Sequence, residues 1–175
     1  MKKLKNEELN RVSVEAFKSQ KKNNVIVVLD NIRSLNNVGS AFRTSDAFNV
    51  QKIFLCGITG TPPHRDIHKT AIGATDSVEW EYAKDTLTVI RQLQDEGWKI
   101  IAVEQADGSL KLNHFSVQEN EKYCFIFGNE VFGVEQDVVD ASDGCLEIPQ
   151  YGTKHSLNIS VTIGVVLWQY IASKS

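Results

Sequence analysis

Residues 25–44, VIVVLDNIRSLNNVGSAFRT, join a continuously apolar and β-branched run to a segment with the apolar spacing of a helix. The run 25–29 is typical of a parallel strand that is covered on both faces. Helical spacing then relates Val38, Ala41, Phe42, Ser45 and Phe48. Asn36 or Asn37 is available as the N-cap of this helix.

Further along the chain, strand patterns alternate with helix patterns. Apolar runs of strand length occur at 52–57, 78–82, 99–104, 123–127 and 145–148. Helices are expected from Asp85, a good N-cap, to Gly97, and over 135–141. An amphipathic helix over 6–20 is expected before the first strand. This alternation predicts an α/β fold with a largely parallel sheet and helices on both faces.

Length and composition bound the kind of protein. A chain of 175 residues with 42% apolar residues is long enough for one domain with a proper core. No apolar stretch reaches the ~18 residues of a membrane span, and no signal peptide is recognisable, so we expect a cytoplasmic protein without a membrane partner. Cys56, Cys124 and Cys145 form no C-x-x-C pair, which favours buried free thiols over a disulfide or zinc site.

Charge is unevenly distributed along the chain. The net charge is −3, but residues 1–22 carry +4 and the remainder carries −7. This is a localised basic feature on an acidic body. We expect the basic N-terminal helix within residues 1–22 to belong to the same unit as residues 23–175.

The last predicted helix, over 156–172, is apolar on almost every side. A helix that is apolar all round must be covered on all sides. A terminal helix in so small a domain is rarely enclosed by its own chain. We therefore expect part of it to be buried against a second copy of the chain, in a homodimer.

The glycine pattern excludes the common nucleotide-binding loops. No G-x-G occurs, so the dinucleotide fingerprint is absent, and GNEVFG at 128–133 lacks the Lys and Ser or Thr that a P-loop needs next. What remains is a set of three loops that follow predicted strands, 31–44, 128–135 and 148–160. Ligands bind at the carboxyl ends of strands in open α/β sheets, so these loops are expected to converge on one site.

The three loops resemble the motifs of the SpoU (TrmH-like) branch of the SPOUT RNA 2'-O-methyltransferases. The first motif, N-x-G-x-x-x-R-T, is matched by Asn37, Gly39, Arg43 and Thr44. The second, G-x-E-x-x-G, is matched by Gly128, Glu130 and Gly133. The third, I-P-x-x-G-x-x-x-S-L-N-[IV]-S-V, is matched by Ile148, Pro149, Gly152, Ser156, Leu157, Asn158, Ser160 and Val161. The similarity covers residues 23–172.

The resemblance implies a fold, a reaction and an assembly. The fold is the SPOUT α/β-knot over 23–175, in which a C-terminal trefoil knot holds S-adenosylmethionine. The reaction is 2'-O-methylation of a ribose in RNA by an obligate homodimer, with S-adenosylhomocysteine as product and no metal. Transfer RNA is the favoured substrate, with guanosine as one candidate target. The alternatives are an rRNA 2'-O-methyltransferase and an RNA-binding SPOUT domain without catalysis.

Five residues are expected to carry the reaction: Asn37, Arg43, Glu130, Ser156 and Asn158. Arg43 lies at the edge of the apolar stripe of its helix, where a surface arginine is the simpler interpretation. By the resemblance it acts on the ribose hydroxyl, either as a tuned base or as a clamp on a substrate phosphate. Clamping a phosphate requires less free energy than acting as a base, because a guanidinium hardly ever loses its proton. Glu130 is alternatively a helix N-terminal carboxylate, and Ser156 an ordinary N-cap.

The resemblance also implies the contacts to the cofactor and to RNA. The backbone at Gly128, Ile148 and Leu157 would hold the adenine. The full cofactor set consists of Glu104, Gln105, Gly128, Asn129, Gly133, Ile148, Gln150 and Leu157. The RNA-binding set, basic residues at strand ends and in the N-terminal segment, consists of Arg11, Lys18, Lys21, Arg33, Arg65, Lys69 and Lys154.

Overall fold

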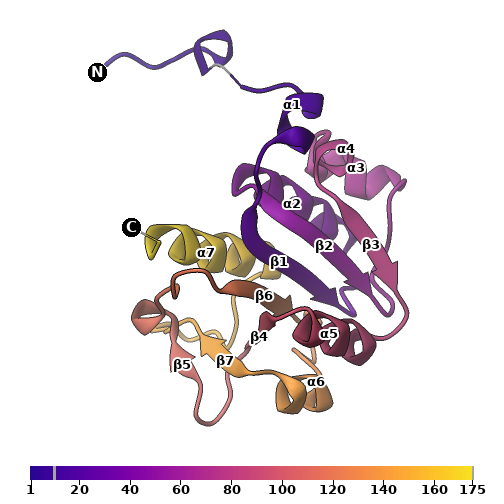
Figure 1. Cartoon of the computed structure of the whole chain (residues 1–175), viewed down its shortest axis with the longest axis vertical. Helices are drawn as coiled ribbons and strands as arrows, with labels where there is room; N and C mark the ends of the chain where they lie inside the picture. The colour runs from indigo at the N-terminus through magenta and orange to yellow at the C-terminus, as the bar shows by residue number, and fades with distance from the viewer. Residues whose placement is uncertain (10, 175) are drawn as a thin grey trace.

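The computed structural model describes residues 1–9 and 11–174, and a seven-stranded parallel sheet forms its centre (Figure 1). The strand order across the sheet is β3-β2-β1-β6-β4-β7-β5. The strands are β1 (Asn23–Asp30), β2 (Val50–Cys56), β3 (Trp80–Ala83), β4 (Trp98–Val103), β5 (Leu110–Lys111), β6 (Lys122–Phe127) and β7 (Gly144–Glu147). Every strand that the apolar runs predicted is present, and the short β5 is additional.

The strand β1 lies between β2 and β6 near the middle of the sheet. Its side chains alternate between two separate cores. Val25, Val27 and Leu29 pack into one core, and Ile26 and Val28 pack into the other. Burial on both faces explains why the sequence of this strand is continuously apolar.

Helices cover both faces of the sheet, as predicted. On one core lie α2 (Leu35–Ala47) and α7 (Ile159–Ala172), which contact each other, and on the other lie α5 (Thr86–Asp95) and α6 (Gln136–Ala141). The connections hold α3 (Arg65–Ala71), α4 (Ala74–Ser77) and the 3₁₀ turn η2 (Leu112–His114). The predicted α/β class with a parallel sheet is confirmed, whereas the C-terminal knot stays a prediction.

Two helices begin at residues other than those predicted. Ser34 caps α2, because its Oγ accepts the N–H of Asn37 at 3.3 Å, so neither Asn36 nor Asn37 is the N-cap. Asn158 caps α7, because its Oδ1 accepts the N–H two residues further on at 2.8 Å. The N-cap role considered for Ser156 is therefore wrong. In both helices the cap is the polar residue immediately before the first turn.

The single helix predicted over 6–20 is also wrong. The segment instead forms a 3₁₀ helix, η1 (Asn6–Leu9), and a short α-helix, α1 (Val14–Ser19), while Asn10 lies outside the described residues. Ser13 has an extended backbone and caps α1 by accepting the N–H three residues further on at 3.2 Å. A helix cannot run through a residue in this conformation. Figure 1 shows that the chain before α1 extends away from the sheet.

The cysteines are free thiols, as predicted. Cys56 and Cys124 are buried, whereas Cys145 is only half-buried. Burial raises the pKa of Cys56 to about 12, so this side chain is a protonated thiol near neutral pH. Within the described residues, no group of His, Cys, Asp and Glu side chains is suited to hold a metal ion. No helix in that part of the chain combines the length and apolar character needed to cross a membrane.

The helices α2 and α3 pack closely at Gly39, where a Cβ atom would overlap the Thr70 hydroxyl and the Ile67 carbonyl oxygen. We expect Gly39→Ala to destabilise the fold by about 1–3 kcal/mol, because the two helices must move apart. Gly164→Ala in α7 is the matched control, since its Cβ would meet only Thr44 Cγ2 at 4.0 Å. That change should stabilise the fold by about 0.5–1 kcal/mol through helix propensity. Urea unfolding measures both effects, and equal stability of the two variants would contradict this packing.

Candidate active site

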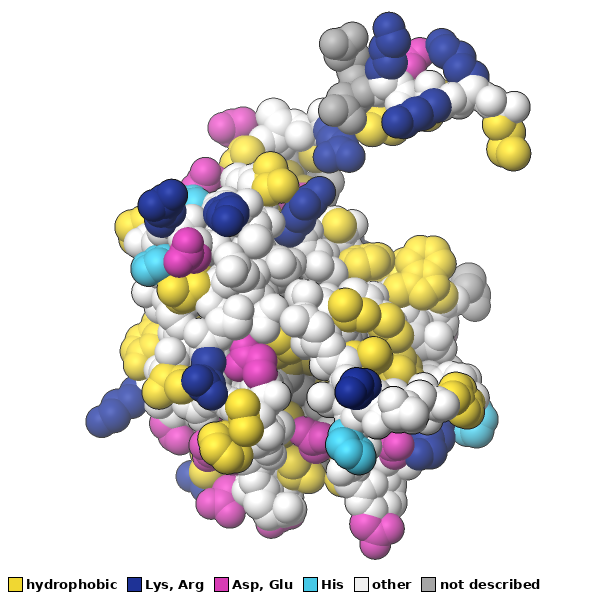
Figure 2. Space-filling view, turned by 180° about the vertical axis from the view of Figure 1, so that it is seen from behind, with side chains coloured by type: hydrophobic (Ala, Val, Ile, Leu, Met, Phe, Trp, Pro, Cys, Tyr) yellow, Lys and Arg dark blue, Asp and Glu magenta, His cyan; other side chains and the backbone are white. Residues whose placement is uncertain are grey.

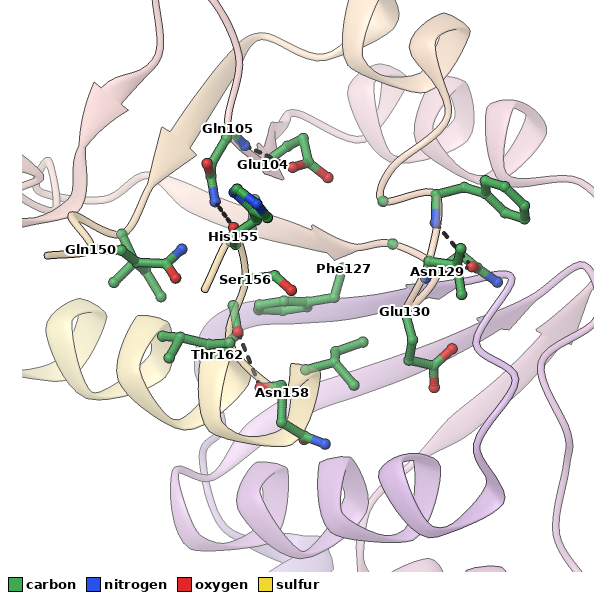
Figure 3. Close-up of a pocket in the computed structure, with 18 of the residues that line it drawn as sticks. Glu104, Gln105, Phe127, Asn129, Glu130, Gln150, His155, Ser156, Asn158 and Thr162 are labelled. Atoms are coloured by element: carbon green, nitrogen blue, oxygen red, sulfur yellow. Dashed lines mark hydrogen bonds between the residues drawn. The ribbon is translucent and has the colours of Figure 1, made fainter. Parts of the chain in front are cut away.

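A cavity of about 550 Å³ opens at the carboxyl ends of β4 and β6, beside the start of α7 (Figure 3). Its size falls within the ~300–1,000 Å³ typical of small-molecule sites. All eight residues of the predicted cofactor set line it, and so do Glu130, Ser156 and Asn158 from the predicted reaction set. Of the three predicted loops, those after β6 and β7 meet here together with the end of β4. The loop 31–44 does not line the cavity but contacts the loop after β6.

The loop after β6, residues 128–134, forms a compact wall of the cavity. The backbones of Asn129 and Gly133 exchange two hydrogen bonds, each 2.9 Å long. A Cβ on Gly128 would overlap the Gly133 carbonyl and the Val134 nitrogen. Gly133 itself has φ +72°, which favours glycine. The two glycines of the G-x-E-x-x-G pattern are therefore required by close backbone approach and by backbone conformation.

Glu104 and Gln105, at the end of β4, join the other walls of the cavity. Glu104 Oε2 accepts the N–H of Val134 at 3.1 Å, and its Oε1 accepts the N–H of Gln105 at 2.8 Å. Gln105 Nε2 donates in turn to the carbonyl oxygen of His155 at 2.6 Å, as Figure 3 shows. These residues therefore hold the loop after β6 and the segment before α7 in fixed positions.

Glu130 connects the loop after β6 to the start of α2. Its Oε2 accepts the N–H of Arg33 at 2.9 Å, and its Oε1 accepts the N–H of Ser34 at 3.0 Å and Asn37 Nδ2 at 2.9 Å. Burial acts to raise the pKa of Glu130, but the hydrogen bonds from these donors outweigh it and lower the pKa below the usual 4.5. Glu130 is therefore a carboxylate at neutral pH that positions Asn37 and the first turn of α2.

The start of α7 supplies the remaining polar wall. Asn158 Oδ1 accepts both the N–H and the hydroxyl of Ser160, at 2.8 and 2.6 Å. Thr162, one turn further on, donates its hydroxyl to the Asn158 carbonyl oxygen at 3.2 Å. Ser156 is exposed on the wall, and its hydroxyl has no hydrogen-bond partner among the described residues. Ser156 is thus the free hydroxyl group of this wall.

Arg43, like Asn37, is a predicted reaction residue that does not line the cavity. It is exposed, and it lies six residues after Asn37, about 9 Å further along α2. The buried residues of α2 are Val38, Gly39, Ala41, Phe42 and Ser45, and because Gly39 lies one helical turn before Arg43, Arg43 borders this buried stripe. Within residues 1–9 and 11–174, no hydrogen bond or ion pair holds the guanidinium. It is free to meet a molecule that binds across α2.

Several cavity residues were missed by sequence reasoning. They are Val103, Val131, Phe132, Phe127, Leu146, His155, Ile159 and Thr162. Most of them adjoin a motif residue, as His155 adjoins Ser156, and Thr162 lies one helical turn after Asn158. Adjacency and helical spacing are thus the signals that could have found them.

The predicted RNA-binding residues are all exposed. Arg11, Lys18 and Lys21 precede β1, and Arg65 and Lys69 lie on α3. Arg33 and Lys154 are nearer the cavity, in the segments before α2 and α7. Figure 2 shows Lys and Arg side chains on the N-terminal arm and on the body below it. The basic residues therefore form separate groups rather than one continuous patch.

Comparisons with known proteins identify relatives of this chain. The model of the SpoU rRNA Methylase family matches residues 24–168. A 23S rRNA (guanosine-2'-O-)-methyltransferase RlmB of Neisseria meningitidis is 27% identical over 143 residues, which are 82% of this chain and 56% of that protein. A tRNA (guanosine(18)-2'-O)-methyltransferase of Thermus thermophilus is 26% identical over 93% of this chain and 81% of its own length. This chain spans about half the length of the RlmB relatives.

Solved structures show the same fold. An AdoMet-bound rRNA methyltransferase from Sinorhizobium meliloti has a TM-score of 0.79 and 25% identity, and covers 93% of this chain and 60% of its own. A TrmH/SpoU tRNA modifying enzyme from A. aeolicus has a TM-score of 0.77 and 25% identity, over 89% of this chain and 77% of its own.

Replacing Glu130 by Gln tests the hydrogen bonds that connect the Glu130 carboxylate to the start of α2. The lowered pKa means that the stabilisation is present above the unfolded value of 4.5 and is lost as pH falls through the folded value. We expect Glu130→Gln to lower stability at neutral pH by about 1 kcal/mol, allowing for solvent screening. Urea unfolding should show this difference shrinking as the pH falls to about 3. The exposed Glu119→Gln is the control, and a pH-independent difference for Glu130→Gln would contradict the assignment.

Proposed function

The chain belongs to the SpoU rRNA Methylase family, and we propose that it is an S-adenosylmethionine-dependent RNA ribose 2'-O-methyltransferase of the cytoplasm. The observation that carries this proposal is the cavity at the ends of β4 and β6, lined by all eight predicted cofactor residues. The relatives reported above are named as RNA 2'-O-methyltransferases, which supports the same reaction here.

The residues that line the cavity fit the expected cofactor, S-adenosylmethionine. Gly128 and Gly133 let the loop after β6 pack closely on itself and on Glu104, which gives the compact wall that an adenine would contact. Backbone groups at Gly128, Ile148 and Leu157 would bind it. When bound, S-adenosylmethionine supplies a methyl group that is already activated by its sulfonium, so a metal is not needed for the transfer. The chain's contribution is then mainly positioning.

The residues around the cavity take distinct positioning roles. The carboxylate oxygens of Glu130 accept hydrogen bonds from the residues at the start of α2, and one of these bonds holds Asn37 beside the cavity. The free hydroxyl of Ser156 and the amide of Asn158 orient the ribose. Arg43, exposed and without an intramolecular partner in the described chain, clamps a phosphate of the RNA, while another group or water takes the proton of the 2'-hydroxyl.

We also propose that the chain works as a homodimer. The outer side of α7 exposes Val161, Val165 and Trp168, which are 50%, 38% and 62% exposed. Figure 2 shows hydrophobic side chains gathered over α7. A second copy seated on this side would cover the apolar surface that the chain itself leaves open.

The RNA substrate is proposed to be tRNA, with guanosine as one candidate target. The exposed basic residues, Arg11, Lys18, Lys21, Arg33, Arg65, Lys69 and Lys154, supply contacts to its phosphates. Ribosomal RNA is the alternative substrate, because some relatives of similar identity are named as 23S rRNA enzymes. A domain that binds RNA without catalysis would bind it and transfer no methyl group.

Incubation with S-adenosylmethionine carrying a labelled methyl group and separate tRNA and rRNA fractions tests the reaction. We expect label in 2'-O-methylated nucleosides, with tRNA the better acceptor. Arg43→Ala should lower kcat by about 100-fold or more and leave cofactor affinity unchanged, because the clamp aligns the ribose. Arg91→Ala on α5 is the control. Retention of full activity by Arg43→Ala would contradict its role, and absence of both cofactor binding and label would contradict the proposed function.

Light scattering or sedimentation tests the dimer. Trp168→Glu places a charge in the apolar side of α7 and should convert the dimer to a monomer, since a buried unpaired charge is costly. Ile58→Glu is the matched control, because Ile58 is 68% exposed and lies away from α7, in the loop after β2. A Trp168→Glu protein that remains dimeric would show that another surface mediates association.

A further inference from the structure

The loop after β6 carries two of the most exposed apolar side chains near the cavity. Val131 is 64% exposed and Phe132 is 84% exposed, and both line the cavity mouth. Leaving a phenyl ring in water forgoes the stabilisation of burying it, so such a ring is unusual on a surface that only solvent contacts. The two side chains are called here the 131–132 tip, and they present apolar surface that the chain itself leaves uncovered.

The 131–132 tip is held outward by a rigid backbone. Asn129 Oδ1 accepts the N–H groups of Val131 and Phe132, at 2.9 and 3.2 Å. Asn129 Nδ2 donates to the Asn31 carbonyl oxygen at 2.7 Å, which fixes the loop to the end of β1. With the two backbone bonds between Asn129 and Gly133, these contacts fix the backbone from which the exposed ring projects.

The charges around the tip indicate the kind of partner. Arg33 lies beside it, because its N–H bonds the carboxylate of Glu130, and its side chain is exposed. Lys154 is exposed in the segment that forms the other wall. In the described part of the chain, neither cation has a carboxylate partner. An exposed aromatic ring beside unpaired cations is typical of surfaces that stack unpaired nucleobases and bind their phosphates.

We propose that Phe132 is a positioning residue that stacks on the nucleobase of the nucleotide whose ribose is methylated. This inference rests on the proposed function and adds how the target nucleotide is held. Phe132 lies two residues after Glu130, and its ring would hold the base at the mouth of the cavity while the ribose enters the cavity. A second copy is the less suitable occupant, because charged residues are depleted at the core of protein interfaces and α7 already offers an uncharged apolar side.

Binding and kinetics of Phe132 variants test the stacking. Phe132→Ala should raise the Kd and the KM for the substrate RNA about tenfold. Phe132→Trp should retain the wild-type values, whereas Phe132→Leu should not. Dimerisation and the salt dependence of RNA binding should be unchanged. Arg33→Gln should in contrast flatten the salt dependence, because it removes a phosphate contact. Ile58→Ala is the control for an exposed apolar side chain away from the cavity.

An abasic ribose at the mapped target position provides the decisive substrate. Wild type and Phe132→Ala should bind this RNA equally, because the base that stacks is missing. Wild-type RNA binding by Phe132→Ala, or its conversion to a monomer, would overturn the inference. If methyl transfer occurs and Phe132→Ala behaves normally, only the inference fails. If the wild type transfers no methyl group, the proposed function fails, and the inference about the methylated nucleotide fails with it.

Discussion

The carboxylate of Glu130 is the contact on which the geometry of the site depends. The first turn of α2 contains no acidic residue of its own, and its leading N–H groups have no partners within the helix. Glu130 supplies both the acceptor oxygens and the negative charge that a helix start favours. It does so across separations of 93 to 97 residues in sequence. The same bonds fix the loop 128–134 at the edge of the cavity, so one side chain orders two segments.

The strands and the cofactor cavity were predictable for physical reasons that are visible in the sequence. Strand segments buried on both faces must be apolar, as residues 25–29 of β1 and 123–127 of β6 are. The two glycines of GNEVFG were identifiable by spacing, and the structure explains them by backbone contact at Gly128 and positive φ at Gly133. The order of strands was not predictable, because an apolar run carries no information about which strand lies next to it. The short β5 lacked an apolar run altogether.

The N-cap of α2 was predicted incorrectly because several neighbouring residues offered the same local chemistry. Ser34, Asn36 and Asn37 are all good N-caps, and the choice among them is made together with the long-range bonds from Glu130. At the N-terminus, the local capping preference of Ser13 prevailed over the amphipathic pattern that suggested one helix.

The position of β1 between β2 and β6 has a consequence for how the protein folds during its synthesis. β2 follows β1 closely in the chain, whereas β6 is separated from it by most of the sequence. A polypeptide leaving the ribosome therefore presents β1 with one edge paired and the other open until residues 122–127 emerge. The cavity is consequently among the last features to form. A chain whose synthesis stops before β6 exposes an unpaired, aggregation-prone edge of β1, the kind of surface that chaperones shield.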